Sequence, residues 1–163
     1  MKRRTVTLAR AHGLGAAATL AAALLFGHAA IASGRGAPSA SNPAWQSECG
    51  SCHLAYPPRL LPAASWRALM DDLGRHFGTD AGIDPATATA IRAFLEANAG
   101  RARGSGDETT LRITQTSWFV HEHRKVAART WRSASVGSAA NCAACHTGAE
   151  AGRFSEHDVR IPR

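Results

Sequence analysis

The sequence predicts an all-α fold of two small units, with long loops and little or no sheet. Two stretches space their apolar residues three and four positions apart, as one face of an α-helix requires. The apolar residues of these stretches are Trp66, Leu69, Met70, Leu73 and Phe77, then Ile91, Phe94 and Leu95. Segments rich in proline, glycine and polar residues separate them and favour loops. Nothing in the sequence indicates an extensive sheet.

Residues 1–32 are expected to be a secretory signal peptide and are set aside from the fold. Four basic residues precede or border an apolar run over residues 14–26, and small residues follow in an Ala-x-Ala pattern at 30–32. An uncleaved anchor is the alternative, but the run is shorter than the roughly 20 residues of a membrane span. Cleavage after Ala32 is favoured over cleavage after Ala30 or Ala40. The mature protein is therefore expected in the periplasm.

The positive charge of the chain is largely a property of this leader. The whole chain has 19 Lys and Arg against 12 Asp and Glu, a net charge of +7. Residues 1–32 contain four basic residues and no acidic one, so their removal leaves a net charge of +3. Because no basic stripe is interleaved with aromatic residues, the sequence gives no support for nucleic-acid binding.

The first unit is expected over residues 45–99, after a flexible spacer at 33–44 that is rich in small residues, proline and glycine. A helical turn is expected at 49–53, and three prolines make 54–62 a loop. Ser65 is the expected N-cap of a helix over 66–77, and Gly78 its end. Asp84 and Pro85 suit the N-cap and first position of another helix that reaches about Asn98.

A linker is expected at residues 100–108, where glycine and charge replace apolar periodicity, and the second unit at 109–163. Thr114 or Ser117 is the expected N-cap of one helix from Trp118 to about Trp131. A polar loop at 133–138 then leads to a second helical turn at 142–146.

Two Cys-x-x-Cys-His motifs carry the chemistry of the sequence. They lie at residues 49–53 and 142–146 and use all four cysteines, which are Cys49, Cys52, Cys142 and Cys145. This is the attachment pattern of c-type haem, in which two thiols bond to one porphyrin and the histidine ligates its iron. A zinc site would pair its Cys-x-x-Cys motifs about 15–20 residues apart, and a redox dithiol would need a βαβ context. The sequence therefore predicts two covalently bound c-type haems, with His53 and His146 as proximal ligands.

The sixth ligand of each iron is expected to be histidine. After leader removal Met70 is the single methionine, and its place on an apolar helix face favours core packing. His76 lies beside the apolar face of its expected helix and is the candidate for the first haem. Both irons would then have two histidine ligands.

For the second haem, helical geometry favours His123 over His121, because residues two apart point in nearly opposite directions. His123 shares a face with Phe119 and Val126, whereas His121 lies on a more polar side. His157, eleven residues after His146, remains the alternative distal ligand, and crossed ligation between the two units stays open.

The mature chain resembles the small dihaem cytochrome c family of Proteobacteria over nearly all of residues 45–163. The segments that carry this resemblance are CGSCHLAYPPRLLPAASW (49–66), HFGTDAGID (76–84), RITQTSWFVHEHR (112–124), NCAACHTGAEAGRF (141–154) and VRIPR (159–163). The resemblance implies two small cytochrome c-like units with bis-histidine haems of low potential. It implies a membrane-bound cytochrome b-type donor and a small soluble cytochrome c acceptor. It keeps His76 and His123 as distal candidates without settling the choice against His157.

If both irons have six ligands, no coordination position is open to a substrate. Outer-sphere electron transfer is then the expected role, and no enzymatic activity is expected. The alternative is a haem enzyme, such as a dihaem peroxidase, with one open haem. That alternative would gain if neither His123 nor His157 were a ligand.

Overall fold

The computed structural model describes residues 40–104 and 106–162, so the expected signal peptide and most of the spacer lie outside the described residues. The described part is helical, and its β-pairing is confined to isolated bridges. This confirms the all-α prediction. No helix of these described ranges is long and apolar enough to cross a membrane.

Helix α1 (Pro43–Gly50) begins two residues before the expected start of order at Trp45. The side chain of Asn42 caps it by accepting a hydrogen bond from the backbone N–H of Trp45 at 3.0 Å. Cys49 therefore lies in the last turn of a helix that starts upstream of the motif, and Cys52 follows the end of that helix. The expected isolated turn at 49–53 is thus partly the continuation of α1.

Helix α2 (Ala63–Asp71) is shorter and starts earlier than the expected helix over 66–77. Ser65 is not its N-cap: Pro62 takes that position, and Ser65 is fully buried inside the helix. The helix ends because Asp72 adopts φ −134°, after which Leu73–Arg75 form a 3-10 turn, η2. Phe77 has φ +53°, so it does not belong to any right-handed helix.

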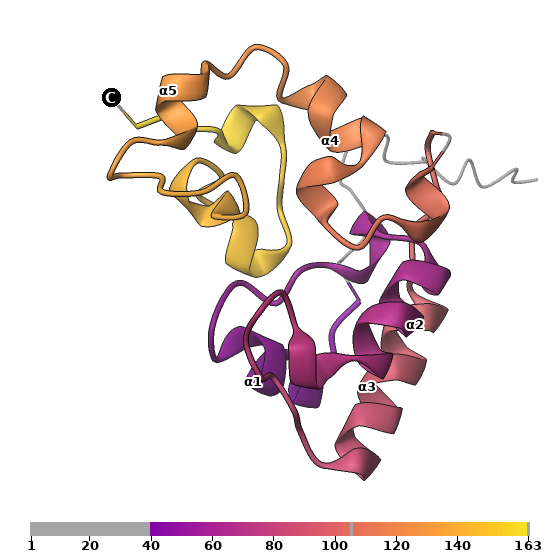
Figure 1. Cartoon of the computed structure of the whole chain (residues 1–163). Helices are drawn as coiled ribbons and strands as arrows, with labels where there is room; N and C mark the ends of the chain where they lie inside the picture. The colour runs from indigo at the N-terminus through magenta and orange to yellow at the C-terminus, as the bar shows by residue number, and fades with distance from the viewer. Residues whose placement is uncertain (1–39, 105, 163) are drawn as a thin grey trace, which may run out of the picture. The chain divides into compact units, whose positions relative to one another are not determined.

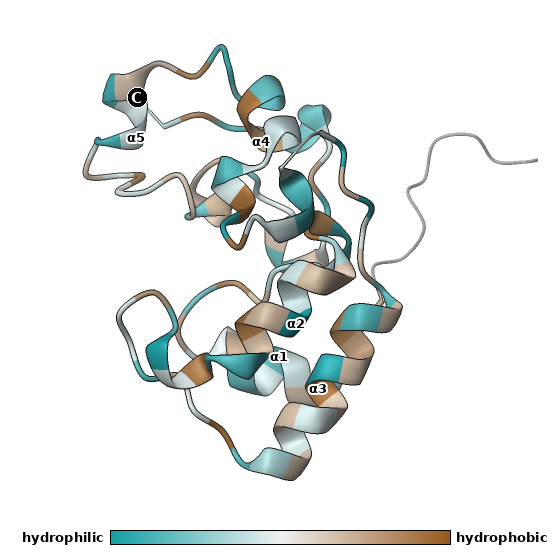
Figure 2. Cartoon of the chain, turned by 45° about the vertical axis from the view of Figure 1, so that its right-hand side comes forward, coloured by the Kyte–Doolittle hydropathy of each residue, from teal (hydrophilic) through white to brown (hydrophobic). Residues whose placement is uncertain are grey.

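Helix α3 (Pro85–Ala97) confirms the prediction of a helix after Asp84. The Asp84 carboxylate accepts hydrogen bonds from the N–H groups of Ala86 and Thr87 at 2.9 and 3.2 Å. Helices α2 and α3 pack side by side (Figure 1) and bury a core with α1. Figure 2 shows both brown and teal residues on α2 and α3, as expected of helices with one buried and one exposed face. The buried core residues are Trp45, Leu61, Trp66, Leu69, Ile91 and Leu95.

The stretch expected as a linker is packed against both of its neighbours. The N–H of Gly100 donates to the carbonyl of Leu61 at 2.9 Å, and a Cβ added to Gly100 would collide with the carbonyl oxygen of Arg59. Asp107 is buried and accepts hydrogen bonds from the N–H and hydroxyl of Ser117 at 3.0 and 2.8 Å. Within this stretch Gly100 and Asp107 are therefore fixed by packing, whereas Arg101, Arg103, Gly106 and Glu108 are exposed.

The expected single helix from Trp118 to Trp131 is wrong: the chain forms α4 (Ser117–Glu122) and α5 (Ala128–Trp131), separated by a turn. The N-cap of α4 is Thr116, whose hydroxyl accepts from the N–H of Phe119 at 3.2 Å. The helix stops at His123, where the N–H of Val126 bonds back to the His123 carbonyl at 2.9 Å.

After α5 the described chain continues as irregular loops and 3-10 turns. These turns are η5 (Cys142–Ala144), η6 (Ala149–Ala151) and η7 (Glu156–Asp158). The C-terminal segment returns to the second motif, because the N–H of Arg160 donates to the carbonyl of Cys145 at 2.7 Å. The second motif is thereby held by backbone bonds more than by a helix.

Candidate functional site

Both Cys-x-x-Cys-His motifs line the same cleft, which has a volume of about 690 Å³. Cys52 and His53 face it from the first motif and Cys142 from the second. The hydroxyl of Tyr56 donates a hydrogen bond of 2.7 Å to the carbonyl of Ala140, two residues before Cys142. Tyr56 therefore connects the segment that follows the first motif to the segment that precedes the second.

His53 faces His76 in the first unit. Their ring centroids are 6.2 Å apart and their planes differ by 21°. The Nδ1 of His53 lies 2.7 Å from the carbonyl oxygen of Leu54, a bond in which the imidazole donates. This fixes the proton on Nδ1 and leaves the lone pair on Nε2. The ring of Tyr56 stacks on His53 with centroids 4.8 Å apart.

His76 is held at the start of a tight turn. Phe77 and Gly78 both have positive φ, at +53° and +97°, and the N–H of Thr79 closes the turn on the His76 carbonyl at 3.1 Å. The ring of Phe77 packs at 4.8 Å from that of His76, and the Arg112 guanidinium lies 4.0 Å above the Phe77 ring. A non-glycine residue with positive φ is strained, and such strain is often found beside functional groups.

His123 faces His146 in the second unit. Their ring centroids are 6.1 Å apart, and their planes differ by 72°. The Nδ1 of His123 lies 2.9 Å from the carbonyl oxygen of Phe119, whose ring stacks on His123 at 4.0 Å. The ring of Phe154 packs on His146 at 5.4 Å. The break of the helix at His123 therefore lets its ring turn toward the second motif.

The spacing of both pairs fits one metal ion between two imidazoles. With metal–nitrogen bonds of about 2.0 Å on opposite sides of an ion, the ring centroids lie roughly 6 Å apart. The Nδ1 atoms of His76 and His146 are buried and have no hydrogen-bond partner within the described ranges. Burial, together with the facing histidine, lowers the pKa of both below 6.5, which favours the neutral ring that binds metal. The donor set is therefore suited to an iron between each pair.

The other candidate ligands lie elsewhere. His121 is exposed in the last turn of α4, and Met70 packs against the core of the first unit. His157 is exposed in η7, where its backbone N–H bonds to the Ser155 hydroxyl at 3.3 Å. The structure thus brings together two histidine pairs and leaves the remaining candidates outside them.

None of the four cysteines forms a disulfide. Burial, with a smaller contribution from Glu48, raises the pKa of Cys49 to about 11. Burial also raises the pKa of Cys142 and Cys145. A raised pKa disfavours the thiolate, the form in which cysteine binds a metal ion, at Cys49, Cys142 and Cys145.

Comparison with known proteins agrees with this geometry. The family model for dihaem cytochrome c matches residues 45–154. The chain belongs to the dihaem cytochrome c family. This confirms the resemblance found in the sequence and the presence of two covalently bound c-type haems.

Solved structures of diheme cytochromes c resemble the chain closely. A diheme cytochrome c from Rhodobacter sphaeroides is 45% identical, with a TM-score of 0.63 over 72% of this chain and 100% of that one. A crystal structure of DHC purified from Rhodobacter sphaeroides is 48% identical, with a TM-score of 0.62 over 71% of this chain and 98% of that one. The diheme cytochrome c from Shewanella baltica OS155 is 38% identical, with a TM-score of 0.66 over 74% and 93%. No curated protein sequence matches the chain significantly.

As a dihaem cytochrome c, the protein is a haem-containing electron carrier. Several residues around its histidines were not singled out by the sequence. Tyr56, Phe77 and Phe154 contact the histidine rings, and the carbonyls of Leu54 and Phe119 orient two of them. An aromatic residue beside a candidate ligand was the available signal for Phe77, whereas the carbonyls carry no signal in a sequence.

Proposed function

We propose that this dihaem cytochrome c is an exported, low-potential electron carrier of the periplasm with two bis-histidine haems. It takes electrons from a membrane-bound cytochrome b-type donor and passes them to a small soluble cytochrome c. The observation that carries the ligand assignment is the pair of ring separations, 6.2 Å for His53 and His76 and 6.1 Å for His123 and His146.

When bound, each haem supplies a one-electron exchange between ferric and ferrous iron. His53 with His76 and His123 with His146 would hold the two irons, and two histidine ligands for each iron would leave no position for a substrate. The Leu54 and Phe119 carbonyls accept the Nδ1 protons of His53 and His123. Such a hydrogen bond makes the imidazole a stronger electron donor to a bound iron. It would therefore favour the ferric state and lower the reduction potential of the haem.

Exposure of the first site supports transfer to a partner by brief contact. Phe77, which packs on His76, is exposed, so electrons would reach this site across a short distance from the surface. Transient redox complexes use small interfaces, and a small exposed surface beside the first site is sufficient for one. Export is supported by the predicted leader.

Single replacements of the histidines test the ligand assignment. His76→Ala and His123→Ala are each expected to convert one of the two ferric haems to high spin and to open one ferrous haem to carbon monoxide. His121→Ala is the matched control beside His123, and His157→Ala tests the alternative ligand; both are expected to leave two low-spin haems. A high-spin haem in the unmodified protein would instead favour a haem enzyme with an open site.

A further inference from the structure

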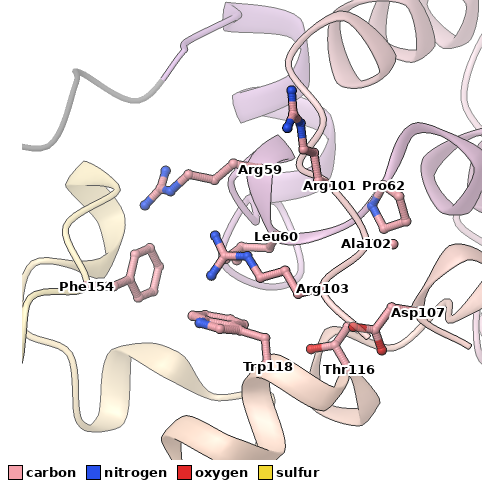
Figure 3. Close-up of a pocket in the computed structure, with 10 residues that line it drawn as sticks. All are labelled: Arg59, Leu60, Pro62, Arg101, Ala102, Arg103, Asp107, Thr116, Trp118 and Phe154. Atoms are coloured by element: carbon pink, nitrogen blue, oxygen red, sulfur yellow. The ribbon is translucent and has the colours of Figure 1, made fainter. Parts of the chain in front are cut away.

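A second cavity, of about 150 Å³, lies at Arg59, Arg103, Trp118 and Phe154 (Figure 3). Figure 3 shows the guanidinium group of Arg103 between the rings of Trp118 and Phe154, and that of Arg59 beside the ring of Phe154. The side chain of Arg101 also borders the cavity, but its guanidinium points away from those rings. Two cations therefore converge on one pocket with aromatic walls.

The chain places these two arginines side by side through backbone packing. Arg59 lies in the 3-10 turn η1 (Pro58–Leu60), and Gly100 allows the following segment to pass directly against the Arg59 carbonyl. The Arg59 guanidinium donates to the Gly152 carbonyl at 2.9 Å and lies 5.7 Å from the Phe154 ring centroid. Arg103 lies over Trp118 at 5.2 Å. Both side chains are thus held in defined positions.

The electrostatics of this pocket favour an anion. Burial lowers the pKa of Arg59, and the charge of Arg103 lowers it further, which shows that the two cations act on each other. Asp107 is on the wall, but its carboxylate already accepts two hydrogen bonds from Ser117. Arginine pairs bind carboxylates with short, directional hydrogen bonds.

The pocket is linked to the second histidine pair through its two aromatic residues, although neither histidine lines it. Phe154 packs on His146, and Phe119, the neighbour of Trp118 in α4, stacks on His123. Its two aromatic walls therefore come from the segments that hold the two faces of the second haem site. The cysteine side of that site opens into the other cleft, which is lined by Cys142 and by neither Arg59 nor Arg103.

We propose that Arg59 and Arg103 bind the propionate carboxylates of the second haem. A c-type haem is joined to its cysteines through the vinyl edge and carries two propionates on the opposite edge. The inference rests on the proposed position of this haem between His123 and His146. Because Arg59 belongs to the first unit, the second haem would also fasten the two units together.

The test compares Arg59→Gln and Arg103→Gln with Arg101→Gln in the haem-loaded protein. Removal of a cation beside a haem favours ferric iron, so the first two variants are each expected to lower one of the two midpoint potentials. They are also expected to shift the propionate bending band in the resonance Raman spectrum of one haem. Arg101→Gln keeps that band and changes the potential less. Arg103→Lys, which retains the charge without the planar fork, is expected to shift the band and largely keep the potential.

Three outcomes would separate the possible failures. If all three glutamine variants keep the propionate band and both midpoint potentials of the unmodified protein, the arginines do not bind propionates. Calorimetry with inorganic phosphate is expected to show no binding to the unmodified protein; phosphate binding that Arg103→Gln abolishes would assign the pocket to a solution anion and overturn the proposal. A high-spin ferric haem in the unmodified protein would contradict the ligand pairs, on which the haem position depends.

Discussion

Replacement of Phe77 tests whether the turn that presents His76 is strained as the structure indicates. Phe77 has φ +53°, a conformation that costs a non-glycine residue about 1 kcal/mol. Its ring is 44% exposed, so its partial burial contributes about 1 kcal/mol. The Arg112 guanidinium at 4.0 Å adds roughly 0.5–1 kcal/mol. The ring is therefore worth about 2 kcal/mol, and the backbone strain offsets about half of that.

Phe77→Ala loses the ring and keeps the strain, so it should destabilise the protein by about 2 kcal/mol. Phe77→Gly loses the ring and relieves the strain, so it should cost only about 1 kcal/mol. Thermal unfolding should therefore place the glycine variant roughly 4 °C above the alanine variant. Ala93, an exposed position within α3, provides the control. There Ala93→Gly should destabilise the protein, because glycine is normally less stable than alanine in a helix. An alanine variant at position 77 as stable as the glycine variant would refute the positive φ.

Three further changes probe the packing around the site. Gly100→Ala should cost about 1–3 kcal/mol because its Cβ meets the Arg59 carbonyl, whereas Gly74→Ala, with open space around it, should change the unfolding free energy by less than about 0.5 kcal/mol; equal effects would contradict the close approach. Tyr56→Phe should cost about 1 kcal/mol in urea unfolding, through loss of the 2.7 Å hydrogen bond to Ala140, while both haems stay low-spin; unchanged stability would argue against that bond. Hydrogen bonds from the N–H of Ser117 and, to a smaller extent, from its hydroxyl hold the pKa of Asp107 below 3.8 in the folded protein. The Asp107 carboxylate therefore contributes stability above pH 3.8, and this contribution is lost as the pH falls through the lower folded pKa. The difference in urea midpoint between the unmodified protein and Asp107→Asn should therefore shrink from pH 7 to pH 3, and a constant difference would contradict this account.

The features that could be predicted from the sequence are those that depend on residues close together in the chain. The two attachment motifs, the Asp84–Pro85 helix start and the all-α class all depend on residues close together in the chain. The error over 118–131 has a local cause: apolar periodicity continues past His123, but the backbone turns there. The same turn brings the His123 ring to His146. The helical-face argument favoured His123 for a different reason, a helix shared with Val126, and the structure does not contain that helix.

Features that depend on tertiary contacts were not predictable in this way. The stretch at 100–108 is rich in glycine and charge, as linkers are, yet Gly100 is needed for a close backbone approach and Asp107 accepts hydrogen bonds from Ser117, the first residue of α4. Arg103 lies in the stretch expected as a linker, and its contact with Trp118 depends on that packing. A single sequence does not distinguish a glycine required by packing from one in a flexible segment.

Electron paramagnetic resonance of the ferric protein tests the two bis-histidine sites most directly. Nearly parallel imidazoles separate the iron d orbitals, whereas nearly perpendicular ones leave them closer in energy. The plane angles of 21° and 72° therefore predict two different low-spin signals of equal intensity, one rhombic and one strongly anisotropic, with no high-spin component. A high-spin signal from either haem would contradict the account, because it would mean that His76 or His123 does not close its site.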